Sequence, residues 1–122
     1  MTGCKTHKDL EIWRRGIDFV SRVYEATKAF PREEEYALKS QMRRAAVSYP
    51  SNIAEGAARS SKREYIQYLY IALGSLSELE TQLLIAERLG YLKATDLLDE
   101  GTSLRKMTLK LTKYLKENTS GP

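Results

Sequence analysis

The strongest constraint on the fold is an apolar pattern that repeats every three or four residues. It is longest between Ser61 and Gly90, where its members are Tyr65, Leu69, Ala72, Leu76, Leu79, Leu83 and Ala86. This spacing places the residues on one face of an α-helix, whereas a strand would alternate every second residue. Ser61 followed by Glu64 is typical of a capping box at a helix start, and Gly90 favours a left-handed helix end. The sequence therefore predicts a long helix between these two residues.

Three further segments repeat the pattern, and we expect helices over residues 8–29, from about Arg32 to Gly56, and 95–117. Phe30-Pro31 separates the first two, because proline disfavours a helical conformation in the residue before it. Thr95 is the expected N-cap of the last helix. Pro50 lies inside the second helix, where we expect a kink; the alternative is a break into two short helices.

The first helix carries two apolar stripes. The stripe that we expect to face the core is Leu10, Trp13, Ile17, Val20, Tyr24 and Thr27. The stripe that we expect to be surplus apolar surface is Ile12, Phe19, Val23, Ala26 and Phe30, and the third helix adds Ile66, Tyr70, Leu73 and Leu84 or Ile85. Such surplus favours a homo-oligomer over a monomer. The small apolar residues Val47, Pro50, Ala54 and Ala57 are candidates for its interface.

Short connections between these helices predict an all-α fold, an antiparallel up-down-up-down four-helix bundle. It would form one domain over residues 8–117, between a flexible leader at 1–7 and a flexible tail at 118–122. The longest uninterrupted apolar run, 68–73, is too short to span a membrane, and residues 1–8 lack a secretory apolar core. We therefore expect a cytoplasmic protein without membrane contact.

Few residues are available for catalysis. The chain has one histidine, His7, and one cysteine, Cys4, both before the first helix. It thus lacks the paired Glu-x-x-His motifs of di-metal helical bundles, and it has no glycine-rich phosphate loop. We expect no enzymatic activity, no metal and no cofactor.

A line of polar residues runs beside the apolar stripe of the second helix. Its members are Gln41, Arg44, Ser48, Asn52 and Glu55, and Glu78 of the third helix is a possible partner for Arg44. Polar side chains on one narrow helix face usually share hydrogen bonds. We interpret the set as a structural network that fixes helix register; a ligand or partner pocket is the alternative.

Basic residues are unevenly distributed. The chain has 20 Lys and Arg against 16 Asp and Glu, a net charge of +4. Arg59, Lys62 and Arg63 cluster before the third helix, near Tyr65 and Tyr68. A second group, on one face of the last helix, is Lys106, Lys110 and Lys113. Basic patches beside aromatic rings suit phosphate binding and base stacking, so both groups are candidates for binding RNA or DNA. The alternative is that they are ordinary solvated helix faces.

Several stretches taken together resemble a known family, the bacterial ribosomal-RNA intervening-sequence proteins, whose relatives include the accessory variability determinant of diversity-generating retroelements. The stretches are HKDLEIW at 7–13, FP at 30–31, EYAL at 35–38, Gln41 with RRAAVS at 43–48, PSNIAEG at 50–56 and ALGSLSELE at 72–80. Asn52 and Glu55 match the family motif and are interpreted as fold-defining. Tyr49 stands where the family usually has an aliphatic residue, and Gly16 where it tends to have alanine.

The resemblance implies four antiparallel helices assembled into a ring-like homopentamer with no assigned catalytic activity. For the retroelement relatives it implies binding of nucleic acid and of a reverse transcriptase. Our leading hypothesis is a non-enzymatic homo-oligomeric bundle that binds nucleic acid or a nucleoprotein partner through its basic patches. The alternative is a protein-interaction scaffold that does not bind nucleic acid.

Overall fold

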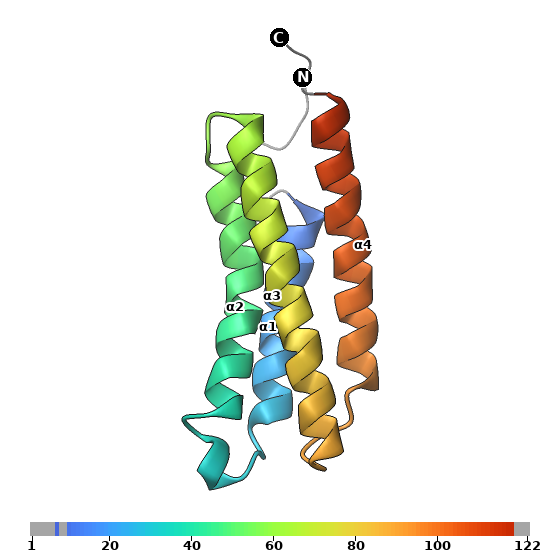
Figure 1. Ribbon diagram of the computed structural model, residues 1–122. Coiled ribbons are helices and arrows are strands. Elements are labelled where there is room, and N and C mark those ends of the chain that lie inside the picture. Colours follow the sequence, from blue (N-terminus) through green and yellow to red (C-terminus); the bar gives the residue numbers. More distant parts are fainter. Residues whose placement is uncertain (1–6, 8–9, 119–122) are drawn as a thin grey trace.

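The chain folds into four long helices. The computed structural model describes residue 7 and residues 10–118, so most of the predicted leader and tail lies outside the described residues. The helices are α1 (Glu11–Thr27), α2 (Leu38–Ala57), α3 (Lys62–Arg88) and α4 (Thr95–Glu117), with a short 3₁₀ turn, η2 (Arg32–Glu34), before α2. No strand occurs in the part of the chain that the structure describes, and successive helices run in opposite directions (Figure 1). The predicted all-α fold of four helices is confirmed.

Both predicted ends of α3 are correct. The Ser61 side-chain oxygen accepts a hydrogen bond from the Glu64 backbone N–H at 3.1 Å. At the other end Gly90 has a φ of 81°, and the N–H groups of Gly90 and Tyr91 donate to the carbonyls of Glu87 and Ala86. This pair of bonds is a Schellman motif, which satisfies two carbonyls that the helix leaves open.

The predicted start of α2 and the predicted N-cap residue of α4 are wrong. The chain forms only a single 3₁₀ turn at Arg32, and α2 begins later, at Leu38, whose N–H donates to the Glu34 side chain at 3.2 Å. The acidic run thus caps α2 from outside instead of forming its first turn. Thr95 is not the N-cap of α4 either, because Ala94 holds that position and donates its N–H to the Glu87 carboxylate at 3.1 Å.

The alternative of a break at Pro50 is excluded, since α2 continues as one helix through this residue. The expected kink stays a prediction. Pro50 is also buried, so it is not part of an exposed surface where a second copy could bind, and its assignment as an interface candidate is wrong.

The core follows the predicted stripe of α3 and an apolar stripe with the same spacing on α2, but it does not follow the predicted stripe of α1. Met42 and Ile53 of α2 and Leu79 of α3 are among the fully buried residues. On α1, however, Ile17 and Tyr24 of the expected core stripe are 41% and 40% exposed. The supposedly surplus Ile12, Phe19 and Val23 are buried instead. Periodicity fixes the spacing within each stripe but does not decide which of two neighbouring apolar stripes turns inward.

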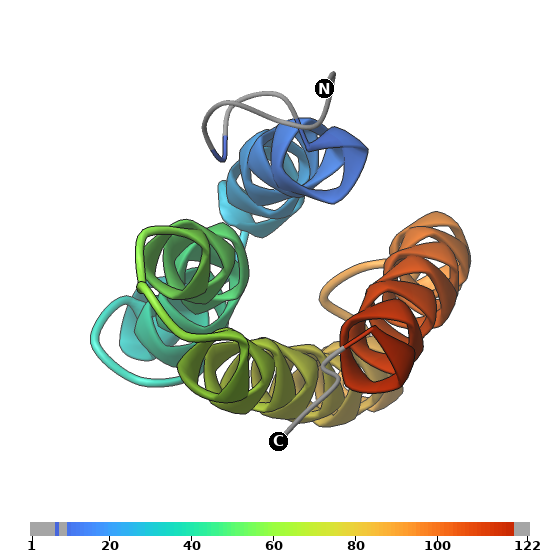
Figure 2. The same cartoon turned by 90° about the horizontal axis from the view of Figure 1, so that it is seen from above.

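The helices follow one another around the bundle in chain order (Figure 2). α2 and α3 make the most extensive contact, and α1 and α4 the least extensive. Between α1 and α4 the interior is filled by large side chains, including those of Phe19, Tyr49 and Leu104. Polar bonds also cross it: Arg15 of α1 donates to both carboxylate oxygens of Glu100 of α4, at 2.8 and 3.2 Å.

The two departures from the family pattern lie against each other in the fold. A Cβ atom added at Gly16 would lie 3.0 Å from Cε2 of the Tyr49 ring. The missing side chain on α1 therefore makes room for the larger ring on α2. The Tyr49 hydroxyl then reaches Thr108 of α4, at 2.7 Å.

Candidate nucleic-acid interface

The fold brings two distant basic segments to one end of the bundle. The turn between α2 and α3 lies at the same end as the last turn of α4 (Figure 1). Lys62 joins them directly, because its Nζ donates to the backbone carbonyl of Asn118 at 2.7 Å. We call this region the basic end and define it by Arg59, Lys62, Arg63, Lys113 and Lys116.

Arg59 is held at the basic end by an aromatic ring and a carboxylate. Its Nη2 donates to the Tyr68 hydroxyl and to the Glu55 side chain, both at 2.7 Å. Its guanidinium carbon lies 4.9 Å from the centre of the Tyr68 ring. The pKa of Arg59 is raised, first by its electrostatic interaction with Tyr68. The result is a fixed cation beside a half-buried ring.

Lys116 makes the equivalent contact from α4. Its Nζ lies 4.9 Å from the centre of the Tyr70 ring and donates to the Tyr70 hydroxyl. Cations from the α2–α3 turn and from α4 therefore flank two tyrosines of one helix, Tyr68 and Tyr70. Sequence reasoning missed Lys116 and treated Tyr70 as apolar surplus. One sequence signal could have identified Lys116: it lies in the last turn of the predicted fourth helix, and the neighbouring third helix carries exposed aromatic residues.

The predicted stripe on α4 extends from the basic end toward the middle of the bundle. Lys106, Lys110 and Lys113 are all exposed and span about 10 Å along the helix axis. Their neighbour Arg105 is engaged with Glu80 of α3, with Nη2 3.5 Å from a carboxylate oxygen. Two exposed acidic residues, Glu64 and Glu117, also lie near this end. Lys and Arg still outnumber Asp and Glu at this end.

The polar residues of α2 divide between two surroundings. Asn52 donates to the carbonyl and the side-chain oxygen of Ser48, at 2.8 and 2.9 Å, and Ser48 bonds across to Ser75 of α3 at 2.8 Å. Glu55 is exposed and binds Arg59, so its assignment to a structural network inside the bundle is wrong. The Ser48–Ser75 hydrogen bond joins α2 to α3.

Gln41, Arg44 and Glu78 line one shallow groove on the surface between α2 and α3. Among the described residues no ion pair joins Arg44 to Glu78, and Glu78 instead accepts a hydrogen bond from Gln82 at 3.3 Å. The sequence correctly predicted that these side chains lie close together. It did not predict which residues they bond to.

The predicted interface candidates other than Pro50 lie at the surface of α2. Val47 is 40% exposed, and Ala54 and Ala57 are half-buried. Exposed aliphatic residues on α3 are Ile71, Leu84 and Ile85, and Leu89 follows at its C-cap; all four are 45–52% exposed. Sequence reasoning included Leu84 and Ile85 but not the other two.

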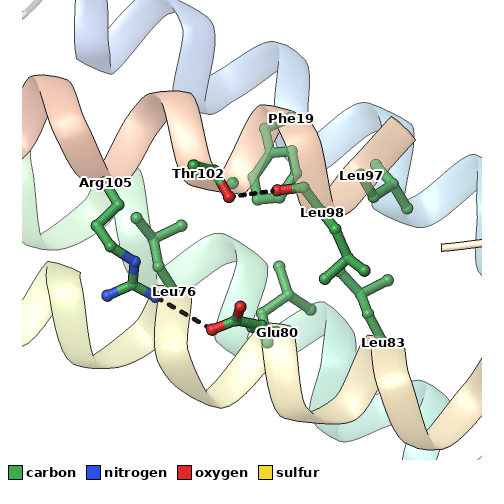
Figure 3. Close-up of a pocket in the computed structure, with 10 residues that line it drawn as sticks. Phe19, Leu76, Glu80, Leu83, Leu97, Leu98, Thr102 and Arg105 are labelled. Atoms are coloured by element: carbon green, nitrogen blue, oxygen red, sulfur yellow. Dashed lines mark hydrogen bonds and ion pairs between the residues drawn. The ribbon is translucent and has the colours of Figure 1, made fainter. Parts of the chain in front are cut away.

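A small apolar crevice lies between α3 and α4 (Figure 3). Phe19, Leu76 and Leu97 are among the residues that line it, with the Arg105–Glu80 pair at its edge. Its free volume is about 10 Å³, which is the space that one water molecule needs. The crevice is therefore a packing feature and not a ligand site. The described residues include no cluster of His, Cys, Asp or Glu that could hold a metal ion, and none of their helices combines the length and apolarity needed to cross a membrane.

Comparison with known proteins identifies the family. The sequence model of the 23S rRNA-intervening sequence proteins matches residues 8–117. The chain belongs to this family. A solved structure of a protein of unknown function from the S23 ribosomal protein family of Bacteroides thetaiotaomicron is similar, with a TM-score of 0.77 and 22% identity over 84% of this chain and 95% of that chain. The likeness to that structure shows the fold. Comparison with the curated proteins gave no match.

The family match extends beyond the motifs that carried the resemblance. It includes α4 and its basic stripe, whereas Asn118, which accepts the hydrogen bond from Lys62, follows directly after the matched residues. The family takes its name from an intervening sequence of 23S rRNA, and the name assigns no activity to the chain.

Proposed function

We propose that this protein is a non-enzymatic, homo-oligomeric helical bundle that binds nucleic acid, or a nucleoprotein partner, through its basic end and the adjoining α4 stripe of Lys106, Lys110 and Lys113. The observation that carries the proposal is the Lys62–Asn118 hydrogen bond, which joins the two basic segments into one surface. Phosphate groups are attracted by the clustered cations, and bases can stack on exposed tyrosine rings. The 45% exposed Tyr70 ring offers such a platform beside Lys116.

Assembly is the second part of the proposal. Exposed apolar side chains on α3, including Ile71 and Leu84, are half exposed in a single copy and would be covered by another copy. The resemblance implies a ring-like homopentamer, and a ring would repeat the basic end around its circumference. Repetition strengthens binding to a long strand, because the second contact on the same strand is intramolecular. This offsets the modest charge of +4 per chain.

A cytoplasmic location and a nucleic-acid enzyme as partner complete the proposal. A reverse transcriptase is the partner that the resemblance implies. The alternative function, a scaffold for protein contacts alone, draws on the same exposed residues of α3. The two functions differ in their response to salt, because binding through phosphates weakens steeply as the salt concentration rises.

The test is a charge reversal on α4. Lys106→Glu, Lys110→Glu and Lys113→Glu are combined, and binding of labelled single-stranded RNA, single-stranded DNA and duplex DNA is titrated at several salt concentrations. The assembly mass of each variant is measured by light scattering. We expect weaker binding and, for single strands, a salt slope that is smaller by about 2, since each of the lysines neutralises one phosphate.

A charge-matched variant with Arg22→Glu, Lys28→Glu and Lys93→Glu is the control, because these cations are also exposed but lie away from the basic end. It should lose much less affinity than the α4 variant. Equal losses of affinity in the two variants would mean that binding depends only on the net charge of the protein. Absence of binding to every nucleic acid at low salt would reject the proposal and favour the scaffold.

A further inference from the structure

A second cationic surface lies at the other end of α2. It is a groove between the last turns of α1 and the first turns of α2, about 25 Å along α2 from the basic end. We call it the α1/α2 groove. The residues that matter for the argument are Tyr24, Glu35, Tyr36, Lys39, Arg43 and Arg44, all of which line it.

Arg43 is fixed in the groove by three contacts. Its Nε donates to the Thr27 side-chain oxygen at 2.9 Å, and its Nη2 donates to the Tyr24 carbonyl at 3.0 Å. Its guanidinium carbon lies 4.3 Å from the centre of the Tyr24 ring. The Nη1 hydrogens have no partner among the described residues, so they are available to a ligand. An arginine held in this way loses little rotamer freedom when it binds an anion.

The groove has more positive than negative charge. Lys39 is paired with Glu35, whose carboxylate oxygen is 2.9 Å from the lysine Nζ. This hydrogen bond, together with the charges of Lys39 and Arg43, lowers the pKa of Glu35. Arg44 is exposed and has no hydrogen bond or ion pair within the described part of the chain. The two arginine charges are therefore uncompensated in the groove.

An aromatic ring stands at the edge of the same groove. Tyr36 is 95% exposed, so its ring contributes almost nothing to packing within this chain. A ring in water that lines the same groove as two guanidinium groups can stack on a planar base whose phosphate the arginines hold. An anion without an aromatic ring would contact only the arginines, and an apolar ligand would contact only the tyrosine. A ligand with both a phosphate and a base would contact all three residues.

We propose that the α1/α2 groove binds a nucleotide, with Arg43 and Arg44 on its phosphate and Tyr36 stacked on its base. The site is separate from the basic end and does not depend on it. The nucleotide can be free in solution or part of an RNA strand. Both sources present the same phosphate and base to the groove, and the experiment separates them.

The experiment titrates the protein with AMP, adenosine, inorganic phosphate and a short single-stranded RNA, and measures heats of binding. The variants are Arg44→Glu and Tyr36→Ala, both at exposed positions that should leave folding intact. Arg88→Glu is the matched control, because Arg88 is exposed on α3 outside the groove. Helix content and thermal unfolding are measured for every variant.

We expect AMP to bind more tightly than adenosine or phosphate alone. Tyr36→Ala should weaken AMP binding by at least about fivefold and leave phosphate binding unchanged, since a stacked base contributes that much. Arg44→Glu should weaken AMP by at least about tenfold, as expected for loss of a charged phosphate contact. Binding of RNA but not AMP, with the same response to both variants, would identify a strand as the source.

The proposal is overturned if no probe binds, or if Arg88→Glu lowers affinity as much as Arg44→Glu. If AMP does not bind, RNA binding that falls in the triple α4 variant but is unchanged by Arg44→Glu would also overturn it, while leaving the basic end in place. Conversely, AMP binding that survives in the α4 variant would support the groove even if the basic end binds nothing.

Discussion

The contact between α2 and α3 and the contact between α1 and α4 are built in different ways. At the first, Gly56 allows close approach: a Cβ atom there would lie 2.7 Å from Cβ of Tyr68 and 3.2 Å from the backbone oxygen of Tyr65. At the second, a Cβ atom at Gly101 would lie 3.8 Å from Cζ of Phe19, an ordinary van der Waals distance. Glycine is required by packing in one place and leaves unused space in the other.

The contact between α1 and α4 relies more on polar side-chain interactions. The Arg15–Glu100 ion pair joins these helices directly, and the hydrogen bond raises the pKa of Arg15. Tyr49 reaches across from α2 to Thr108 of α4. Thr108 donates its own hydroxyl hydrogen to the Leu104 carbonyl, so Tyr49 is the donor between the two side chains. Close packing at Gly56, together with the Ser48–Ser75 hydrogen bond, positions α2 against α3, whereas an ion pair and the Tyr49–Thr108 hydrogen bond help to position α4.

The largest effect is expected for Gly56→Ala. The added Cβ atom would force α2 and α3 apart, because the atoms that it meets are a Cβ and a backbone oxygen and not the end of a flexible side chain. We expect the free energy of unfolding to fall by about 1–3 kcal/mol. Urea denaturation measures it. Gly74→Ala is the control, since nothing lies within 4 Å of a Cβ atom at that position, and a matching loss there would refute the packing argument.

Tyr49→Phe should have an intermediate effect. Loss of the buried hydrogen bond should lower the free energy of unfolding by about 0.5–1.5 kcal/mol at neutral pH. Burial raises the pKa of Tyr49 to about 12, partly opposed by the Thr108 hydrogen bond. In the unfolded chain a tyrosine loses its proton near pH 10, so the unfolded state binds fewer protons than the folded state above that pH.

The contribution of Tyr49 is thus fully present below pH 10 and is lost as the pH rises toward 12. In the wild type its loss should lower the free energy of unfolding by about 1.4 kcal/mol per pH unit in this window. Tyr49→Phe lacks this component, so the gap between the two proteins should narrow above pH 10. Denaturation at pH 7, 9, 10 and 11 measures the gap. If the free energies of unfolding of the two proteins change in parallel with pH, burial does not raise the pKa of Tyr49.

The smallest effect, of opposite sign, is expected for Gly101→Ala. Alanine is the better helix former, and its Cβ atom meets Phe19 at an ordinary distance. We expect the free energy of unfolding to rise by about 0.5–1 kcal/mol. The same urea denaturation applies. A loss as large as that of Gly56→Ala would mean that the two sides of the bundle are packed alike.

Local signals explain which parts of the fold could be predicted. The α3 stripe, the Ser61–Glu64 capping box and Gly90 act within a few residues, and each was correct. The inward face of α1 could not be predicted, because it depends on how Phe19 and the Gly16–Tyr49 pair fit against other helices. The start of α2 was missed because the acidic run stabilises a helix from outside as well as from within.

The candidate sites follow the same division. Arg59, Lys62 and Arg63 form a cluster in the sequence itself. The contact of Lys62 with Asn118 at the end of α4 could not be predicted, because more than fifty residues separate the two segments and only the fold joins them. Arg43 carried no sequence signal of its own. Its importance comes from Tyr24 and Thr27, two residues of another helix that hold its guanidinium group.

Trp13 is the chain's one tryptophan, and it lies half-buried on α1, packed against the core. Its fluorescence therefore reports on α1 without any added label, whereas circular dichroism averages over all four helices. If α1 leaves the bundle before α2 and α3 separate, the emission change precedes the loss of helicity during unfolding. If the two signals change together, the whole bundle unfolds as one cooperative unit.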